Sequence, residues 1–171
     1  MQHDKLQCEQ ITSSEPRLEV LRELQELSVA IFSPYFPATL HNHPSFYFSE
    51  WQSRLTLPNS IVFYATTPMS GKPLGFFFAH PRTQPEIGHE LFHIWLVGVD
   101  PNSRGLGIFP LLMDRMKQHA RDCGYSELTI CTRPKQFDKM YRILCEHGWQ
   151  EVAWRLMEDG ELQQVLMKMR I

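Results

Sequence analysis

A change of hydrophobic periodicity along residues 91–131 limits the possible folds more than any other feature of the sequence. Residues 91–99 are nearly all apolar, which is typical of a central strand covered on both faces. Soon afterwards apolar residues recur at helical spacing until Gly124 ends the pattern, namely Ile108, Leu111, Leu112 and Met116. Residues 128–131 then form another short strand pattern. The sequence therefore predicts a strand–helix–strand crossover, which joins two parallel strands.

The patterns on either side of this crossover favour antiparallel strands. Strand-like runs at residues 61–66 and 74–79 are separated by a loop with proline and glycine, and runs at 149–157 and 162–169 flank the turn signal Asp159-Gly160. A short strand is expected at residues 6–11. Ser13 or Ser14 is expected to cap a first helix that reaches about Phe32, and a last helix is expected at 137–144, ending at Gly148. The predicted fold class is α/β: a mixed, mostly antiparallel sheet with a central parallel strand–helix–strand crossover and flanking helices.

Length and composition predict a single domain spanning residues 1–171. Hydrophobic residues make up 43% of the chain and charged residues 21%, with a formal net charge of −2. Without a basic face, nucleic acid is not expected as a partner. Because no apolar run approaches the ~18 residues that span a bilayer and no signal peptide is evident, we expect no membrane association and a cytoplasmic location. Four cysteines without C-x-x-C spacing are expected to be free thiols.

The junction between the central strand and the following helix has the features of an anion site. Gly105 and Gly107 lie there, beside Arg104. The first N–H groups of a helix lack intrahelical partners, and the helix dipole favours negative charge beside them. Glycine also lets a phosphate approach the backbone closely. Taken alone, such a Gly-x-Gly is a weak signal, and an ordinary tight turn is the more common explanation.

The residues around this junction resemble the pyrophosphate loop of the GNAT-type N-acetyltransferases. Arg104-Gly105-Leu106-Gly107-Ile108 matches the first two fixed positions of that loop, whereas Phe109 replaces the small residue of the third and Pro110 follows it. The order of strands and helices is similar to that superfamily over nearly the whole chain. The resemblance implies acetyl-CoA, or another acyl-CoA, as cofactor. It places the pyrophosphate on Arg104, Gly105, Leu106, Gly107, Ile108 and Phe109, and the pantetheine arm on Val97, Gly98 and Val99.

The same resemblance implies transfer of an acetyl or short acyl group to a primary amine of a small molecule or peptide by direct attack. It maps a general base onto His93, with Glu90, acting through water, as a second candidate. The tyrosine expected in the last helix falls on Leu144, and Tyr141, one turn earlier, is the candidate acid or a core residue. The aromatic segment 32–51, which also holds His41 and His43, corresponds to the acceptor pocket, with Tyr35 and Tyr47 as candidate substrate-binding residues. The oligomeric state stays open.

Two other functions compete with this interpretation. A non-catalytic acyl-CoA sensor would share the fold, and the missing tyrosine favours it. His89-Glu90-Leu91-Phe92-His93 is an H-E-x-x-H, which in zinc hydrolases lies on a helix. Here an apolar run follows and Gly98 and Pro101 would cut a helix short, so we expect a strand and no metal.

Overall fold

The computed structural model, which describes residues 5–36, 43–157, 160 and 163–171, contains one seven-stranded sheet. Its strands in spatial order are β1 (Gln7–Ile11), β2 (Ile61–Thr66), β3 (Gly75–Thr83), β4 (Glu90–Val99), β5 (Glu127–Thr132), β7 (Gln163–Arg170) and β6 (Gln150–Leu156). Strands β4 and β5 are parallel, and the other neighbouring pairs are antiparallel. The predicted fold class is confirmed, including the parallel crossover between β4 and β5.

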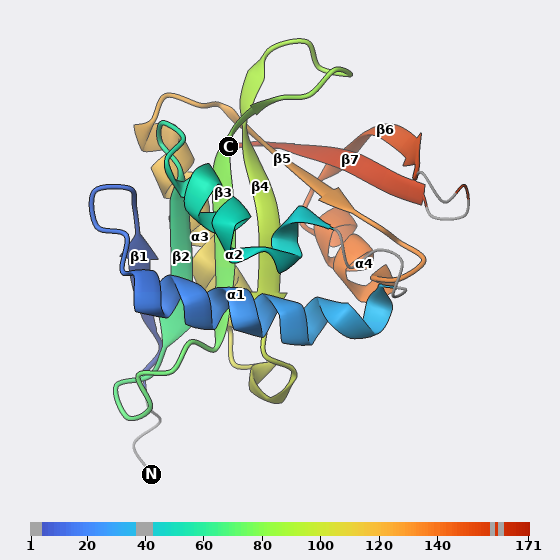
Figure 1. The fold of residues 1–171 in the computed structure, drawn as a ribbon. Coiled ribbons are helices and arrows are strands. Elements are labelled where there is room, and N and C mark those ends of the chain that lie inside the picture. The colour runs from blue at the N-terminus through green and yellow to red at the C-terminus, as the bar shows by residue number, and fades with distance from the viewer. Residues whose placement is uncertain (1–4, 37–42, 158–159, 161–162) are drawn as a thin grey trace.

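Helices cover both faces of this sheet (Figure 1). Helices α1 (Leu18–Phe32) and α2 (Phe48–Leu55) lie across one face, whereas α3 (Ile108–Asp122) lies behind the sheet and α4 (Asp138–Glu146) lies beside β5 to β7. Short 3₁₀ turns occur at Ser33–Tyr35, Pro44–Phe46 and Pro101–Ser103. The helix α3 and the strands around it form the crossover, so the loop before α3 is held at one end of β4.

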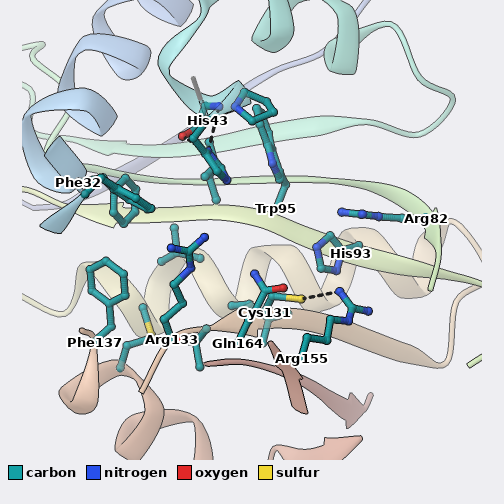
Figure 2. A pocket seen from close by; sticks show the side chains of 18 of the residues that line it. Phe32, His43, Arg82, His93, Trp95, Cys131, Arg133, Phe137, Arg155 and Gln164 are labelled. Atoms are coloured by element: carbon teal, nitrogen blue, oxygen red, sulfur yellow. Dashed lines mark hydrogen bonds between the residues drawn. The ribbon is translucent and has the colours of Figure 1, made fainter. Parts of the chain in front are cut away.

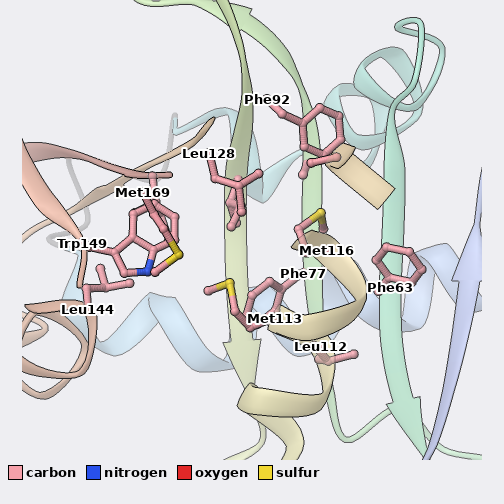
Figure 3. Packing of buried hydrophobic residues seen from close by; sticks show 14 of the residues in the cluster. Phe63, Phe77, Phe92, Leu112, Met113, Met116, Leu128, Leu144, Trp149 and Met169 are labelled. Carbon is pink, nitrogen blue, oxygen red and sulfur yellow. The ribbon is translucent and has the colours of Figure 1, made fainter. Parts of the chain in front are cut away.

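Each face of the sheet has its own hydrophobic core. Behind the sheet, α3 and α4 bury a cluster that includes Phe77, Phe92, Met116, Leu144 and Trp149 (Figure 3). On the other face, α1 and α2 pack on a second cluster around Trp51, Phe76 and Phe78. Burying one such side chain contributes roughly 1.5–3 kcal/mol. The two cores hold β3 and β4 between them as a rigid platform.

The start of α1 and the existence of α2 differ from the sequence prediction. Thr12 and Glu15 exchange backbone hydrogen bonds in a tight turn, which takes Ser13 and Ser14 out of the capping position. The helix begins after Arg17, whose backbone is left-handed with φ 38°. Helix α2 occupies the end of the aromatic segment that has no clear periodicity, and it is anchored by Trp51, whose indole N–H donates to Ser45 O over 3.1 Å.

A bulge in β4 opens the sheet beside the crossover. Phe78 pairs with Leu96 and Ala79 pairs with Ile94, so Trp95 has no partner on β3. The bulge puts Trp95 and Leu96 on the same face, toward α1 and α2, while Ile94 and Val97 face α3. Pairing between β4 and β5 runs from Phe92 to Ile94 and ends there, although β4 continues to Val99. The two parallel strands therefore separate just beyond the bulge.

Candidate functional site

A groove of about 650 Å³ lies where the end of β4 meets the start of α3. Eight of the nine residues predicted to bind the cofactor line it, namely Val97, Gly98, Val99, Arg104, Gly105, Gly107, Ile108 and Phe109. The ninth, Leu106, belongs to the same loop, but its side chain is 58% exposed and does not line the groove. The opposite wall is formed by Phe137 to Met140 at the start of α4.

The loop between β4 and α3 presents a series of backbone N–H groups. Gly105 and Gly107 both have φ 83°, a left-handed conformation that glycine adopts without strain. Within the described residues, none of the recorded hydrogen bonds is donated by the N–H groups of residues 105–109. Pro110 has no N–H group, but it lies in the first turn of α3, where an N–H group would have no helical hydrogen-bond partner. Phe109 packs its ring against Phe77 with centroids 5.2 Å apart. The large side chain that replaces the expected small residue therefore packs behind the loop.

Gly98 brings helix α1 close to β4 at the floor of the groove. A Cβ on Gly98 would lie 2.7 Å from Phe76 Cε1 and 3.0 Å from Ile31 Cδ1. Glycine is therefore required here by close packing, and it leaves the backbone of β4 accessible along the groove.

A second cavity, of about 340 Å³, adjoins the groove between the separated strands. Phe32, Val97, Phe137 and Met140 line both spaces. The cavity is further lined by residues from α2, β3, β4, β5 and β6 and from the segment after α1, including Phe36, His43, Arg54, Arg82, His93, Trp95, Cys131, Arg133 and Arg155 (Figure 2). Two compartments that meet at Val97 suit a reaction between two bound molecules. They are called the cofactor groove and the acceptor cavity, after the roles that the sequence predicts for them.

His93 lies at the cavity wall with its Nδ1 held by two neighbours. Thr129 Oγ1 is 2.9 Å from Nδ1, and Gln84 Nε2 is 3.3 Å from it. The other end of the Gln84 amide, Oε1, accepts a hydrogen bond of 3.0 Å from Arg155 Nη2. Because a guanidinium only donates, this bond fixes the orientation of the Gln84 amide and directs its NH₂ at His93. Nδ1 is therefore the acceptor, and the neutral imidazole carries its proton on Nε2.

The surroundings of His93 disfavour its protonation. The residue is buried, and burial lowers the pKa of His93 well below its usual value, with Arg82, His80, Arg155 and Arg54 lowering it further. Because Nε2 carries a proton and the lone pair of Nδ1 already accepts a hydrogen bond, the imidazole has no free lone pair to take a proton from the substrate amine. The geometry thus favours His93 as a hydrogen-bond donor in place of the base expected from the sequence.

Glu90 lies outside both compartments. It begins β4 on the face opposite His93 and accepts a hydrogen bond of 2.7 Å from Tyr125 Oη. The H-E-x-x-H segment is strand from Glu90 onward, as predicted, so its histidines lack the helical spacing of a zinc site. Across the residues that the structure describes, no three histidine, cysteine, aspartate or glutamate side chains form a group able to hold a metal ion.

Tyr141 also lies outside both compartments. Its hydroxyl donates to Glu151 on β6, and this hydrogen bond is the largest cause that raises the pKa of Tyr141. Its ring contacts Trp154. The neighbouring Met140 points into the site instead. Leu144, at the position where the resemblance led us to expect a tyrosine, is fully buried in the core. The structure therefore places Tyr141 on the outer side of α4, and a role as acid has no geometric support.

The segment after α1 contributes to the site through residues other than those predicted. Tyr35 lines the cofactor groove, not the acceptor cavity, and Tyr47 is 46% exposed and lines neither. Phe36 and His43 line the acceptor cavity, and His41 falls outside the described residues. Sequence reasoning did not bring the arginines of the cavity together, because they come from four separate segments and no local motif connects them.

Comparison with known proteins agrees with this geometry. Residues 25–143 match the Acetyltransferase (GNAT) family. No curated protein matches the chain. Among solved structures, a GNAT acetyltransferase from Streptococcus pneumoniae superposes with a TM-score of 0.68 at 14% identity, covering 98% of this chain and 100% of that one.

Two further solved structures carry informative ligands. An aminoglycoside acetyltransferase from an uncultured soil metagenomic sample, in complex with sisomicin, has a TM-score of 0.62 at 20% identity and covers 84% of this chain and 87% of its own. A Bacillus anthracis protein in complex with acetyl coenzyme A has a TM-score of 0.58 at 14% identity, covering 70% of this chain and 67% of its own. At these identities the likeness shows the fold.

No helix in the described part of the chain is both long and apolar enough to cross a membrane.

The expected cofactor, acetyl-CoA, is the acetyl donor of the family whose sequence pattern covers residues 25–143. With its sheet topology, the glycine loop before α3 and this sequence match, the chain belongs to the GNAT family of acetyltransferases.

Proposed function

We propose that this chain transfers an acetyl or short acyl group from acyl-CoA to a primary amine by direct attack within one domain. The observation that carries the proposal is the row of N–H groups at residues 105–109, which have no recorded partner and lie at the start of α3 beside the opening between β4 and β5. Such N–H groups at a helix start bind phosphate oxygens. The proposed setting is the cytoplasm, where thiols such as the four free cysteines stay reduced.

The residues present fit a bound acyl-CoA. Gly105 and Gly107 present no Cβ toward the groove, and Arg104 lines it and adds a positive charge for a pyrophosphate. Beyond the bulge, Val97 to Val99 pair with β3 but not with β5, so their backbone groups on the β5 side are available to an extended pantetheine arm. Acetyl-CoA, when bound, supplies the acetyl thioester.

The acceptor cavity determines how the amine reaches the thioester. Val97 and Phe137 line both compartments, so the amine nitrogen and the thioester carbon meet beside them. A bond forms between nitrogen and the carbonyl carbon while the carbon–sulfur bond breaks. The nitrogen releases a proton and the thiolate takes one up. Because the hydrogen bonds of His93 make it a donor, we assign the removal of the amine proton to water and give His93 the role of orienting the acceptor through its Nε2–H.

The test combines cofactor binding with turnover. Gly107→Glu places a carboxylate where the pyrophosphate would bind, so calorimetry should show CoA affinity reduced at least tenfold. Gly124→Glu is the matched control, because Gly124 follows the other end of α3 with a similar φ of 86° and an equally open Cβ position. Unchanged CoA affinity in the Gly107 variant would contradict the site assignment.

Turnover separates the enzyme from the alternative of a sensor. Release of free thiol from acetyl-CoA in the presence of an amine panel, dependent on both substrates, supports the transferase. Tight CoA binding with no thiol release for any amine, free or peptide-bound, favours the non-catalytic sensor instead.

A further inference from the structure

Four arginines from four separate segments line the acceptor cavity. Arg54 comes from the last turn of α2, Arg82 from the end of β3, Arg133 from the residue after β5, and Arg155 from β6. None of the four lines the cofactor groove. Among the described residues, no aspartate or glutamate lines the cavity. A concave site with cationic walls raises the local concentration of anions.

The carboxylates that pair with these arginines lie outside the cavity lining. Glu86 takes a two-point contact from Arg155, with distances of 2.6 and 2.5 Å, and this pair also fixes Gln84. Glu50 is 3.5 Å from Arg54 Nε, and the Arg54 guanidinium stacks on the Trp95 ring at 4.1 Å. Arg82 takes part in no ion pair recorded among the described residues. Although its charge helps to lower the pKa of Glu86, the Arg82 guanidinium can contact a molecule in the cavity without breaking an ion pair.

The two histidines of the cavity respond to this positive potential. Burial is the largest cause that lowers the pKa of His43, and Arg133 and Arg54 lower it further. For His93, Arg82 is the largest charged contributor after burial. The arginine field thus reaches the imidazoles on both sides of the cavity, and an ammonium group placed there would meet the same repulsion.

The cavity has two ends, and the arginines are divided between them. Phe32, Phe137 and Arg133 lie at the end shared with the cofactor groove, whereas Arg82 and Arg155 lie with His93 at the other end, the arginine end (Figure 2). The amine must lie at the shared end, next to the thioester. A substituent that extends from the amine past Trp95 reaches the arginine end.

We propose that the acceptor is an amine that also carries an anionic group, a carboxylate or a phosphate, which binds among the cavity arginines with Arg82 as the accessible contact. This inference rests on the proposed acetyl transfer and names its substrate class. Polycationic amines such as aminoglycosides are then poor acceptors, although one structural neighbour is an aminoglycoside acetyltransferase.

Matched acceptor pairs test the inference. L-Phenylalanine is compared with L-phenylalaninamide, and phosphoethanolamine with ethanolamine, by thiol release from acetyl-CoA, with spermidine and sisomicin as polycations. The anionic member of at least one pair should have a kcat/KM at least tenfold higher, and the pair that responds tells carboxylate from phosphate. The amide is the less basic amine and is more often neutral, so basicity alone would favour it. Equal or faster acetylation of the amines without an anionic group, polycations included, would overturn the inference and leave the transferase function standing.

An arginine variant links the preference to the cavity. Arg82→Glu should raise the KM of the anionic acceptor at least tenfold and leave the KM of acetyl-CoA within twofold, because Arg82 does not line the cofactor groove. Arg121→Glu changes charge equally at an exposed position on α3 that lines neither compartment, and it should change neither KM. If no amine in the panel is acetylated, calorimetry of the CoA-loaded protein with the phenylalanine pair decides: binding of the carboxylate alone supports the inference, and equal or no binding of both refutes it.

Discussion

The side-chain amide of Gln84 donates to Nδ1 of His93 over 3.3 Å, and both residues are at least 98% buried. Since Arg155 fixes the amide orientation, His93 keeps its proton on Nε2. A histidine in this tautomer donates a hydrogen bond through Nε2 and cannot accept a proton at that atom. The first prediction depends on this donor role of His93.

The first prediction concerns catalysis at His93. His93→Gln retains an N–H donor, so kcat should fall by less than tenfold, whereas His93→Leu removes the donor and should lower kcat further. The wild-type profile of kcat/KM against pH should show no enzyme ionisation near pH 6.5, because burial and Arg82 hold the pKa of His93 well below that range. Loss of a general base commonly costs ~10²-fold or more. A loss of that size in His93→Gln, together with a wild-type ionisation near pH 6.5 that disappears, would establish His93 as the base.

The second prediction concerns stability in acid. The folded pKa of His93 is lowered while the unfolded value stays near ~6.5, so below that pH the unfolded chain binds more protons. The free energy of unfolding should therefore decrease as the pH falls from about 6.5 through the folded pKa. His93→Gln should flatten this decrease, measured by urea denaturation at pH 7.5, 6.0 and 5.0. His89→Gln, a change at an exposed histidine, serves as control, and an equal slope in wild type and His93→Gln would refute the explanation.

The third prediction separates three aromatic residues of one segment. Phe36→Ala should raise the KM of the acceptor about threefold or more, since the ring lines the acceptor cavity and lies under the Arg133 guanidinium at 5.0 Å. Tyr35→Ala should instead raise the KM of acetyl-CoA, because Tyr35 lines the cofactor groove and contacts Phe137. Tyr47→Ala should change neither. Steady-state kinetics with each substrate varied in turn would contradict the assignment if Tyr35→Ala altered the acceptor KM alone.

The fourth prediction concerns Tyr141. Tyr141→Phe removes a hydroxyl that donates to Glu151 and faces away from both compartments, so kcat should stay within about twofold of wild type. The ring and its contact with Trp154 are kept, which limits any effect on folding. A tenfold or larger fall in kcat with an unchanged melting temperature would restore Tyr141 as a candidate acid.

The sequence predicted those features that depend on neighbours along the chain. The helical spacing of Ile108 and Met116 predicted α3, and Gly105 with Gly107 predicted an anion-binding loop before it. The apolar run of β4 was less informative, because the bulge at Trp95 depends on pairing with β3, which no local pattern reveals. Helix α2 was likewise not predicted, because its residues show no clear helical periodicity. It is held instead by the hydrogen bond from the Trp51 indole to Ser45 O in the turn before it.

Side-chain direction was the part of the site that sequence reasoning could not supply. Tyr141 and Met140 are adjacent, yet Met140 enters the site and Tyr141 faces β6, since the rotation of α4 depends on how Leu144 and Trp149 pack. The arginine lining required four strands and helices to be placed in space before Arg54, Arg82, Arg133 and Arg155 became neighbours. Residues that come together only through tertiary structure have no characteristic spacing in the sequence from which a shared site could be predicted.

A cradle built from main-chain N–H groups tolerates broad change in side chains. All residues except proline carry the N–H group, so the loop before α3 can exchange Leu106 or Phe109 and still offer the same donors, provided that the two left-handed positions remain glycine. Phe109 already illustrates this, because its ring packs against Phe77 while its backbone N–H remains at the groove. Divergence of the acceptor cavity, whose chemistry lies in side chains, can thus proceed without disturbing the handling of the acyl donor.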